Sequence, residues 1–138
     1  MNIKKSKFDS NHTLIFLDKE DEKYSELLPA FKKHGLAFKH GNFIFFDVPS
    51  LKKNGYFGKT HLTFIEAHEI AHSVLGHTKS TRYNEAEADF LATLLCRKRN
   101  YKKSEELGID EFYARNNIKY SDFSNKYKEK ILSKIKIK

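Results

Sequence analysis

Short apolar runs are characteristic of the first third of the chain, and they predict strands. His12–Asp18 is an apolar run bounded by charges, which indicates one strand. Leu36–Lys39 and Asn42–Val48 are rich in Phe and Ile and flank a glycine-containing turn, so we expect a β-hairpin. The polar segment Met1–Ser10 is expected to be loose, and Leu51–Lys59 is expected to be a loop.

Elsewhere, apolar residues recur every three or four positions, which is the period of an amphipathic helix. Pro29 is expected to delay or kink the first of these helices, and Gly108 to separate two short ones. The helix between Thr60 and Gly76 is apolar on nearly every side, so it should be central and largely buried. The predicted helices are Glu22–His34, one capped by Thr60 and ended by Gly76, Tyr83–Lys98, Lys102–Leu107, Ile109–Asn117 and Ser121–Ile135.

This order of elements predicts an α+β fold in one domain, residues 1–138. A small N-terminal sheet should pack on the helix between Thr60 and Gly76, with both lying within about residues 10–77. A helical half should follow over about residues 82–138. No run approaches transmembrane length, Met1 is followed by a polar, Lys-rich start, and the single cysteine, Cys96, excludes an internal disulfide. We therefore expect a cytoplasmic protein without a membrane partner.

The chain is basic, with 26 Lys and Arg against 18 Asp and Glu and a formal net charge of +8. Such an excess can bind nucleic acid through the phosphates. Much of it lies at the two ends of the chain, however, where a solvated helix face explains it equally well. Direct binding of nucleic acid is therefore not the favoured interpretation.

The chemistry of the chain is concentrated in His68-Glu69-Ile70-Ala71-His72, a complete H-E-x-x-H motif inside the apolar helix. Residues four apart on a helix point the same way, so His68 and His72 can bind one metal ion. Glu69 lies about 100° around the helix from His68, close enough to hold a water molecule beside the metal without being a ligand. The pattern predicts a zinc hydrolase in which Glu69 is the general base.

A catalytic zinc ion usually has three protein ligands and one open position, so the two histidines need a partner. His77 follows His72 by five residues where the metzincin spacing needs six, and on a continuous helix it would point away from the metal. We expect it to be a helix-terminal cation instead. The remaining candidates lie in Asn84-Glu85-Ala86-Glu87-Ala88-Asp89, on the next helix.

Glu85 and Asp89 are one turn apart and share a helix face, so one can bind zinc while the other orients a ligand histidine. Glu85 is preferred over Asp89 as the ligand. Glu87 points elsewhere, and we expect it only to complement the dipole of its helix.

These two segments together resemble the ImmA/IrrE family of small cytoplasmic metallopeptidases. That family pairs an H-E-x-x-H helix with a second helix of the pattern E-x-E-A-N/D, and Asn84-Glu85 through Asp89 is also similar to the N-E-x-x-x-D segment of thermolysin-like gluzincins. The resemblance implies a minimal zincin-like domain that holds Zn²⁺ by His68, His72 and Glu85. It also implies that Asp89 supports a histidine and that the protein substrate is a helix-turn-helix repressor of a phage or mobile element.

The expected reaction is zinc-assisted hydrolysis of a peptide bond, with Glu69 moving the proton. Tyr56, His61 and Tyr83 remain open as donors to the oxyanion. An extended substrate is expected to add to a strand edge at Phe43–Val48. The alternative is a non-catalytic, zinc-stabilised regulator that binds a transcription factor or DNA, which the presence of Glu69 argues against.

Overall fold

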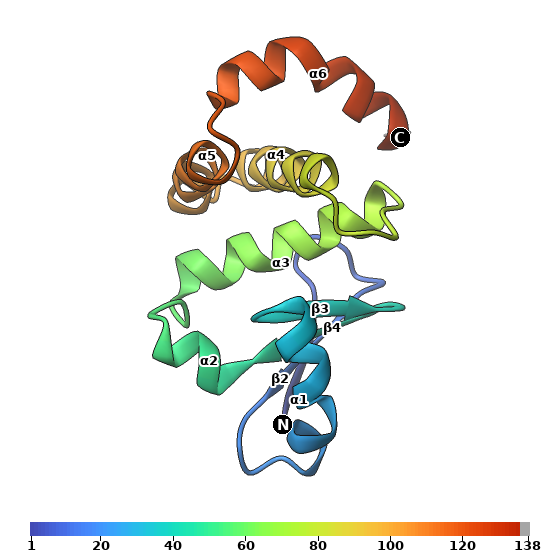
Figure 1. Cartoon of the computed structure of the whole chain (residues 1–138), viewed down its shortest axis with the longest axis vertical. Helices are drawn as coiled ribbons and strands as arrows, with labels where there is room; N and C mark the ends of the chain where they lie inside the picture. Colours follow the sequence, from blue (N-terminus) through green and yellow to red (C-terminus); the bar gives the residue numbers. More distant parts are fainter. Residues whose placement is uncertain (136–138) are drawn as a thin grey trace.

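The computed structural model describes residues 1–135, which form a small mixed sheet and six helices (Figure 1). The fold is α+β, as predicted from the order of the apolar patterns. The strands are β1 (Asn2–Lys5), β2 (Thr13–Leu17), β3 (Ala37–His40) and β4 (Phe43–Asp47). The helices are α1 (Glu22–His34), α2 (Val48–Lys53), α3 (Lys59–Val74), α4 (Arg82–Lys98), α5 (Lys102–Asn116) and α6 (Tyr120–Ile135).

The sheet has the strand order β1-β2-β4-β3. β2 and β4 are parallel neighbours, and β3 and β4 form the predicted hairpin. The expectation of a loose N-terminus was wrong, because β1 pairs antiparallel with β2 and starts the sheet at Asn2 instead of near residue 10. All four residues of β1 are exposed, so the strand has no hydrophobic alternation and is held mainly by backbone hydrogen bonds that a pattern search does not detect.

The two faces of the sheet are covered by different helices, because successive side chains of a strand point to opposite sides. On one face, Ile15 and Leu17 pack against Phe31 of α1. On the other face, Leu14 and Phe46 pack against Ile70 of α3. Buried on both faces, β2 is the continuous apolar run seen in the sequence.

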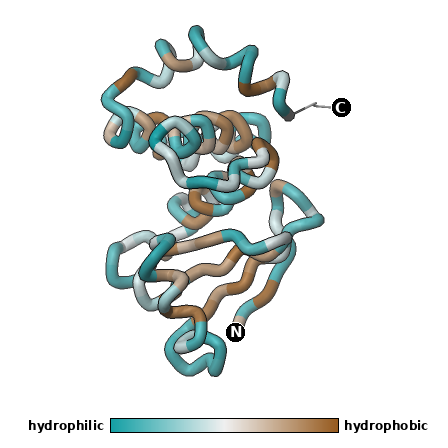
Figure 2. The backbone as a smooth tube through the Cα atoms, turned by 45° about the vertical axis from the view of Figure 1, so that its right-hand side comes forward, coloured by the Kyte–Doolittle hydropathy of each residue, from teal (hydrophilic) through white to brown (hydrophobic). Residues whose placement is uncertain are grey.

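Helix α3 lies between the sheet and the helices α4 and α5, and α6 lies beyond them at the far end of the molecule (Figure 1). The prediction of a central, buried helix is confirmed, since seven of its residues are buried, from Thr63 to Ala71. Figure 2 shows hydrophobic positions most continuous in the strands, whereas α6 is largely hydrophilic. No helix formed by residues 1–135 is long and apolar enough to cross a membrane.

Several predicted boundaries need correction. Asp47 caps α2 by accepting a hydrogen bond from Ser50 N at 3.2 Å, so the first part of the expected loop Leu51–Lys59 is helical. Helix α3 is preceded by Gly58 as its N-cap and not by Thr60. Helix α1 begins at Glu22 and continues through Pro29, whose position is exposed. Proline has no backbone N–H, so the carbonyl four residues before it has no hydrogen-bond donor in the helix. At this exposed position that carbonyl can bond to water instead.

The predicted break at Gly108 is also wrong, because α5 is continuous from Lys102 to Asn116. Gly108 is buried on the same face of α5 as Ser104 and Phe112. A Cβ atom at Gly108 would lie 2.7 Å from a ring carbon of Phe64 and closer still to Thr93 Oγ1. The glycine therefore lets α5 approach α3 and α4 closely, which is a packing requirement and not a turn.

Candidate metal centre

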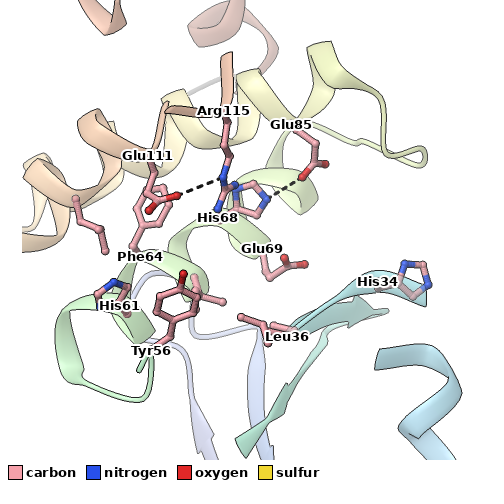
Figure 3. A pocket seen from close by; sticks show the side chains of 13 residues that line it. His34, Leu36, Tyr56, His61, Phe64, His68, Glu69, Glu85, Glu111 and Arg115 are labelled. Atoms are coloured by element: carbon pink, nitrogen blue, oxygen red, sulfur yellow. Dashed lines mark hydrogen bonds and ion pairs between the residues drawn. The ribbon is translucent and has the colours of Figure 1, made fainter. Parts of the chain in front are cut away.

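The H-E-x-x-H helix presents both of its histidines to the first turn of α4. His68 Nε2 lies 3.1 Å from His72 Nε2 and 3.2 Å from Glu85 Oε1, and His72 Nε2 lies 2.9 Å from Glu85 Oε2. Thr81 starts α4 by accepting a hydrogen bond from Asn84 N, which places Glu85 in the first helical turn. His68, His72 and Glu85 thus converge from two helices on one point. Figure 3 shows His68 and Glu85 of this group facing each other.

This donor set suits a zinc ion. Ligands about 2.0–2.1 Å from a tetrahedral ion lie roughly 3.3 Å from one another. The three observed separations of 2.9–3.2 Å are close to that value. Two imidazoles and one carboxylate also leave one coordination position open for water or substrate. The three side chains therefore fit a tetrahedral metal ion with one open coordination position.

A buried carboxylate lies beside the Nδ1 atom of His68. Asp89 Oδ1 lies 2.8 Å from His68 Nδ1, within ion-pair distance although not aligned for a hydrogen bond. Asp89 is fully buried and also contacts Arg115 Nη1 of α5 at 3.1 Å. Burial alone would lower the pKa of His68, but Asp89 and Glu85 outweigh it and raise that pKa to about 10.

Glu69 projects into the cleft beside the three convergent groups (Figure 3). Burial raises the pKa of Glu69, partly opposed by the positive charge that His68 and His72 can carry. The hydrogen bonds from His68 and His72 instead lower the pKa of Glu85 well below its usual range. The two carboxylates therefore differ in basicity: Glu85 is suited to binding a cation, and Glu69 to accepting a proton.

Two adjoining cavities form the cleft, one of about 240 Å³ and one of about 200 Å³. Both are lined by Ala37 of β3 together with Glu69 and Glu85, so the cleft follows β3 past the convergent groups. Leu36 lines the first cavity, and Lys39 lines the second. The cleft therefore runs beside the edge strand β3.

The strand that borders this cleft differs from the one predicted. Phe43–Val48 was expected to offer an open edge, but β4 is paired with β2 on one side and with β3 on the other. Among the strands of residues 1–135, β3 is the edge next to α3. The expectation was wrong because the order of strands in a sheet depends on long-range pairing, which local hydrophobicity does not encode.

Of the three open candidates for oxyanion donors, Tyr56 and His61 line the first cavity, with their rings stacked 4.9 Å apart. Tyr83 instead packs against Tyr127 of α6, at a centroid distance of 5.7 Å, and lines neither cavity of the cleft. Arg115 lines the first cavity as well and was not singled out from the sequence. It lies 26 residues from Asp89 on another helix, so no local spacing could have indicated it.

Two further expectations were wrong. His77 does not point away from the convergent groups, since His77 Nδ1 is 3.0 Å from His72 Nδ1. Glu87 does not merely complement a helix dipole, because it is fully buried and lies 2.9 Å from His77 Nε2. One sequence signal pointed to Glu87: it precedes the buried Leu91 by one turn, so it falls within the apolar stripe of α4.

Comparisons with protein-family models, with curated proteins and with solved structures found no match to this chain. The function of the candidate metal centre is therefore inferred from its own residues and geometry.

Proposed function

We propose that this protein is a zinc-dependent endopeptidase with a zincin-like site. The supporting observation is the convergence of His68, His72 and Glu85 beside Glu69, at the floor of a cleft that follows a free strand edge. A structural zinc site is usually closed by four protein ligands, whereas this set offers three and has a carboxylate beside it.

A bound zinc ion would polarise the scissile carbonyl and lower the pKa of the attacking water. Glu69 takes the proton of that water and later returns it to the leaving amine. Its raised pKa suits both steps, because a base with a pKa closer to neutrality is also a competent acid. Tyr56, His61 and Arg115 line the cavity from which a hydrogen bond to the developing oxyanion can be donated.

The substrate is a peptide in extended conformation, paired with β3. Asp47 N donates to Leu36 O at 2.9 Å, so Leu36 and Asp47 form a hydrogen-bonded pair of the hairpin. Such pairs alternate with non-hydrogen-bonded ones in antiparallel sheets, so the backbone N–H and C=O groups of Ala37 and Lys39 face away from β4. A substrate strand can bond to these groups while its scissile bond lies over Glu69.

The identity of the substrate protein is suggested by the sequence motifs. Their resemblance to the ImmA/IrrE family favours a regulatory protein, such as a helix-turn-helix repressor, as the natural substrate.

Replacement of Glu69 tests the catalytic part of the proposal. Glu69→Gln should bind zinc like the wild type, because it leaves all three ligands in place, and should lose nearly all cleavage because it removes the base. Metal content is measured by mass spectrometry, and cleavage by sequencing the products of a synthetic peptide library.

The outcomes separate the two candidate functions. Zinc binding without cleavage by the wild type would favour the non-catalytic regulator. Cleavage by Glu69→Gln at the wild-type rate would contradict the role of Glu69 as the base. His72→Ala is the matched control, since it should lose both zinc and cleavage.

A further inference from the structure

A second chain of polar contacts leads from His72 away from the cleft. His72 Nδ1 lies 3.0 Å from His77 Nδ1, and His77 Nε2 lies 2.9 Å from Glu87 Oε1. Lys134 Nζ of α6 then contacts both oxygens of Glu87, at 3.2 and 3.1 Å. Four side chains from the end of α3, the turn after it, α4 and α6 thus form one continuous path.

The end of α3 explains how His77 reaches His72. Gly76 has a φ of +69°, and the backbone N–H groups of Gly76 and His77 donate to the carbonyls of Ser73 and His72, respectively. These are the two hydrogen bonds of a Schellman motif, which folds the chain back over the last helical turn. The side chain of His77 therefore lies beside His72 and does not continue along the helix.

The direction of each hydrogen bond follows from the metal site. If His72 binds a metal through Nε2, its one remaining proton is on Nδ1, which must then donate. His77 Nδ1 is in place to accept that proton, so neutral His77 carries its own proton on Nε2 and donates it to Glu87. Every donor in the path then meets an acceptor.

The middle of the path, His77 and Glu87, is buried. The side chain of Glu87 has no solvent exposure, and that of His77 has 7%. A carboxylate so completely removed from water needs a counter-charge and hydrogen bonds. Lys134 supplies the charge, and His77 supplies a further hydrogen bond. The Glu87 carboxylate of α4 is thereby oriented by contacts from α6 and from the turn after α3, and it orients His77 in turn.

We propose that His77, held by Glu87 and Lys134, is a positioning residue that keeps His72 in the tautomer and orientation in which its Nε2 binds the metal. The role parallels that of Asp89 behind His68, but a second imidazole is interposed between the ligand and the carboxylate. The inference rests on the proposed function for the identity of the ligands.

Two substitutions of His77 separate this role from simple packing. Asn places its Oδ1 near the position of His77 Nδ1, so His77→Asn keeps an acceptor for His72. Gln places its amide nitrogen near the position of His77 Nε2, so His77→Gln keeps the donor to Glu87 and loses that acceptor. His77→Gln should weaken zinc binding by about 10- to 100-fold, and His77→Asn by much less.

Zinc dissociation constants of the full-length variants are measured by competition with a chromophoric chelator, and thermal unfolding of the metal-free variants controls for stability. Equal affinity of the wild type and His77→Gln, or an equal loss in both variants, would overturn the positioning role. A wild type that binds no zinc would overturn the proposed function and this inference together.

A measurement on the wild type does not depend on any variant folding. In the zinc form, ¹⁵N NMR of the histidine side chains should show a proton on His72 Nδ1 and a scalar coupling across the hydrogen bond to His77 Nδ1. A zinc-bound His72 with its proton on Nε2, or without the coupling to His77, would contradict the proposal.

Discussion

At the scale of single residues, His68 is the group through which the proposed metal site should respond to pH. Its pKa of about 10, against an ordinary value of 6.5, means that the metal-free protein keeps a proton on His68 at neutral pH. Because the pKa is raised on folding, the contacts of His68 stabilise the metal-free protein fully below about pH 6.5. That contribution is lost as the pH rises through 10. On the proposed function, zinc would displace the same proton when it binds.

Zinc affinity should therefore increase with pH. Between about pH 6.5 and 8.5 the apparent affinity should increase roughly tenfold per unit, with one proton released from His68 for each zinc ion bound. Calorimetry in buffers of different ionisation enthalpy measures that release. Asp89→Asn removes a main cause of the raised pKa of His68. The zinc affinity of this variant should therefore increase less steeply with pH over the same range. An affinity that does not change with pH would contradict the protonation of His68.

At the scale of elements, the role of β3 depends on which of its backbone groups point outward. Ala37 and Lys39 face the free edge, whereas Leu36 and Phe38 face β4, because the Leu36–Asp47 hydrogen bond sets the alternation. The edge and the metal centre lie along the same cleft. Substitutions at Lys39 should therefore affect the proposed substrate binding, whereas substitutions at Phe38 should affect the stability of the sheet.

Lys39→Pro should reduce kcat/KM for peptide cleavage by about tenfold, since one hydrogen bond to substrate is worth about 1.4 kcal/mol. Zinc binding and the free energy of unfolding should change little, because the lost N–H does not bond to β4. The measurements are steady-state cleavage and urea denaturation.

Lys39→Ala controls for the side chain and should keep the hydrogen bond to substrate. Phe38→Pro removes an N–H that bonds to β4, so it should destabilise the fold instead. Equal cleavage by Lys39→Pro and the wild type would rule out strand addition at β3.

At the scale of the whole molecule, the proposed metal centre joins the sheet side of the fold to the helical side. His68 and His72 belong to α3, which packs on the sheet, and Glu85 belongs to α4. The path through Glu87 and Lys134 adds α6, which otherwise packs at the outer end of the helical layers. Metal binding should therefore stabilise the molecule as a unit.

Zinc at a free concentration of 100 times its dissociation constant should raise the free energy of unfolding by about 2.7 kcal/mol, because it binds only the folded chain. Urea denaturation with and without a chelator measures the difference. Glu85→Ala lacks the α4 ligand, so the same zinc concentration should raise its free energy of unfolding far less. If this variant were stabilised as much as the wild type, Glu85 would not be a ligand.

Features that depend on helix geometry follow from the spacing of residues in the sequence. A helix brings residues four apart to one face whatever surrounds it, so the pairing of His68 with His72 and the shared face of Glu85 and Asp89 could be predicted from spacing. The contacts that these side chains make with other segments could be learned only from the tertiary structure. Gly76 turns His77 back onto His72, Lys134 reaches Glu87 across 47 residues, and β1 and β3 take the edges of the sheet. These contacts arise from the packing of distant segments, which no local period specifies.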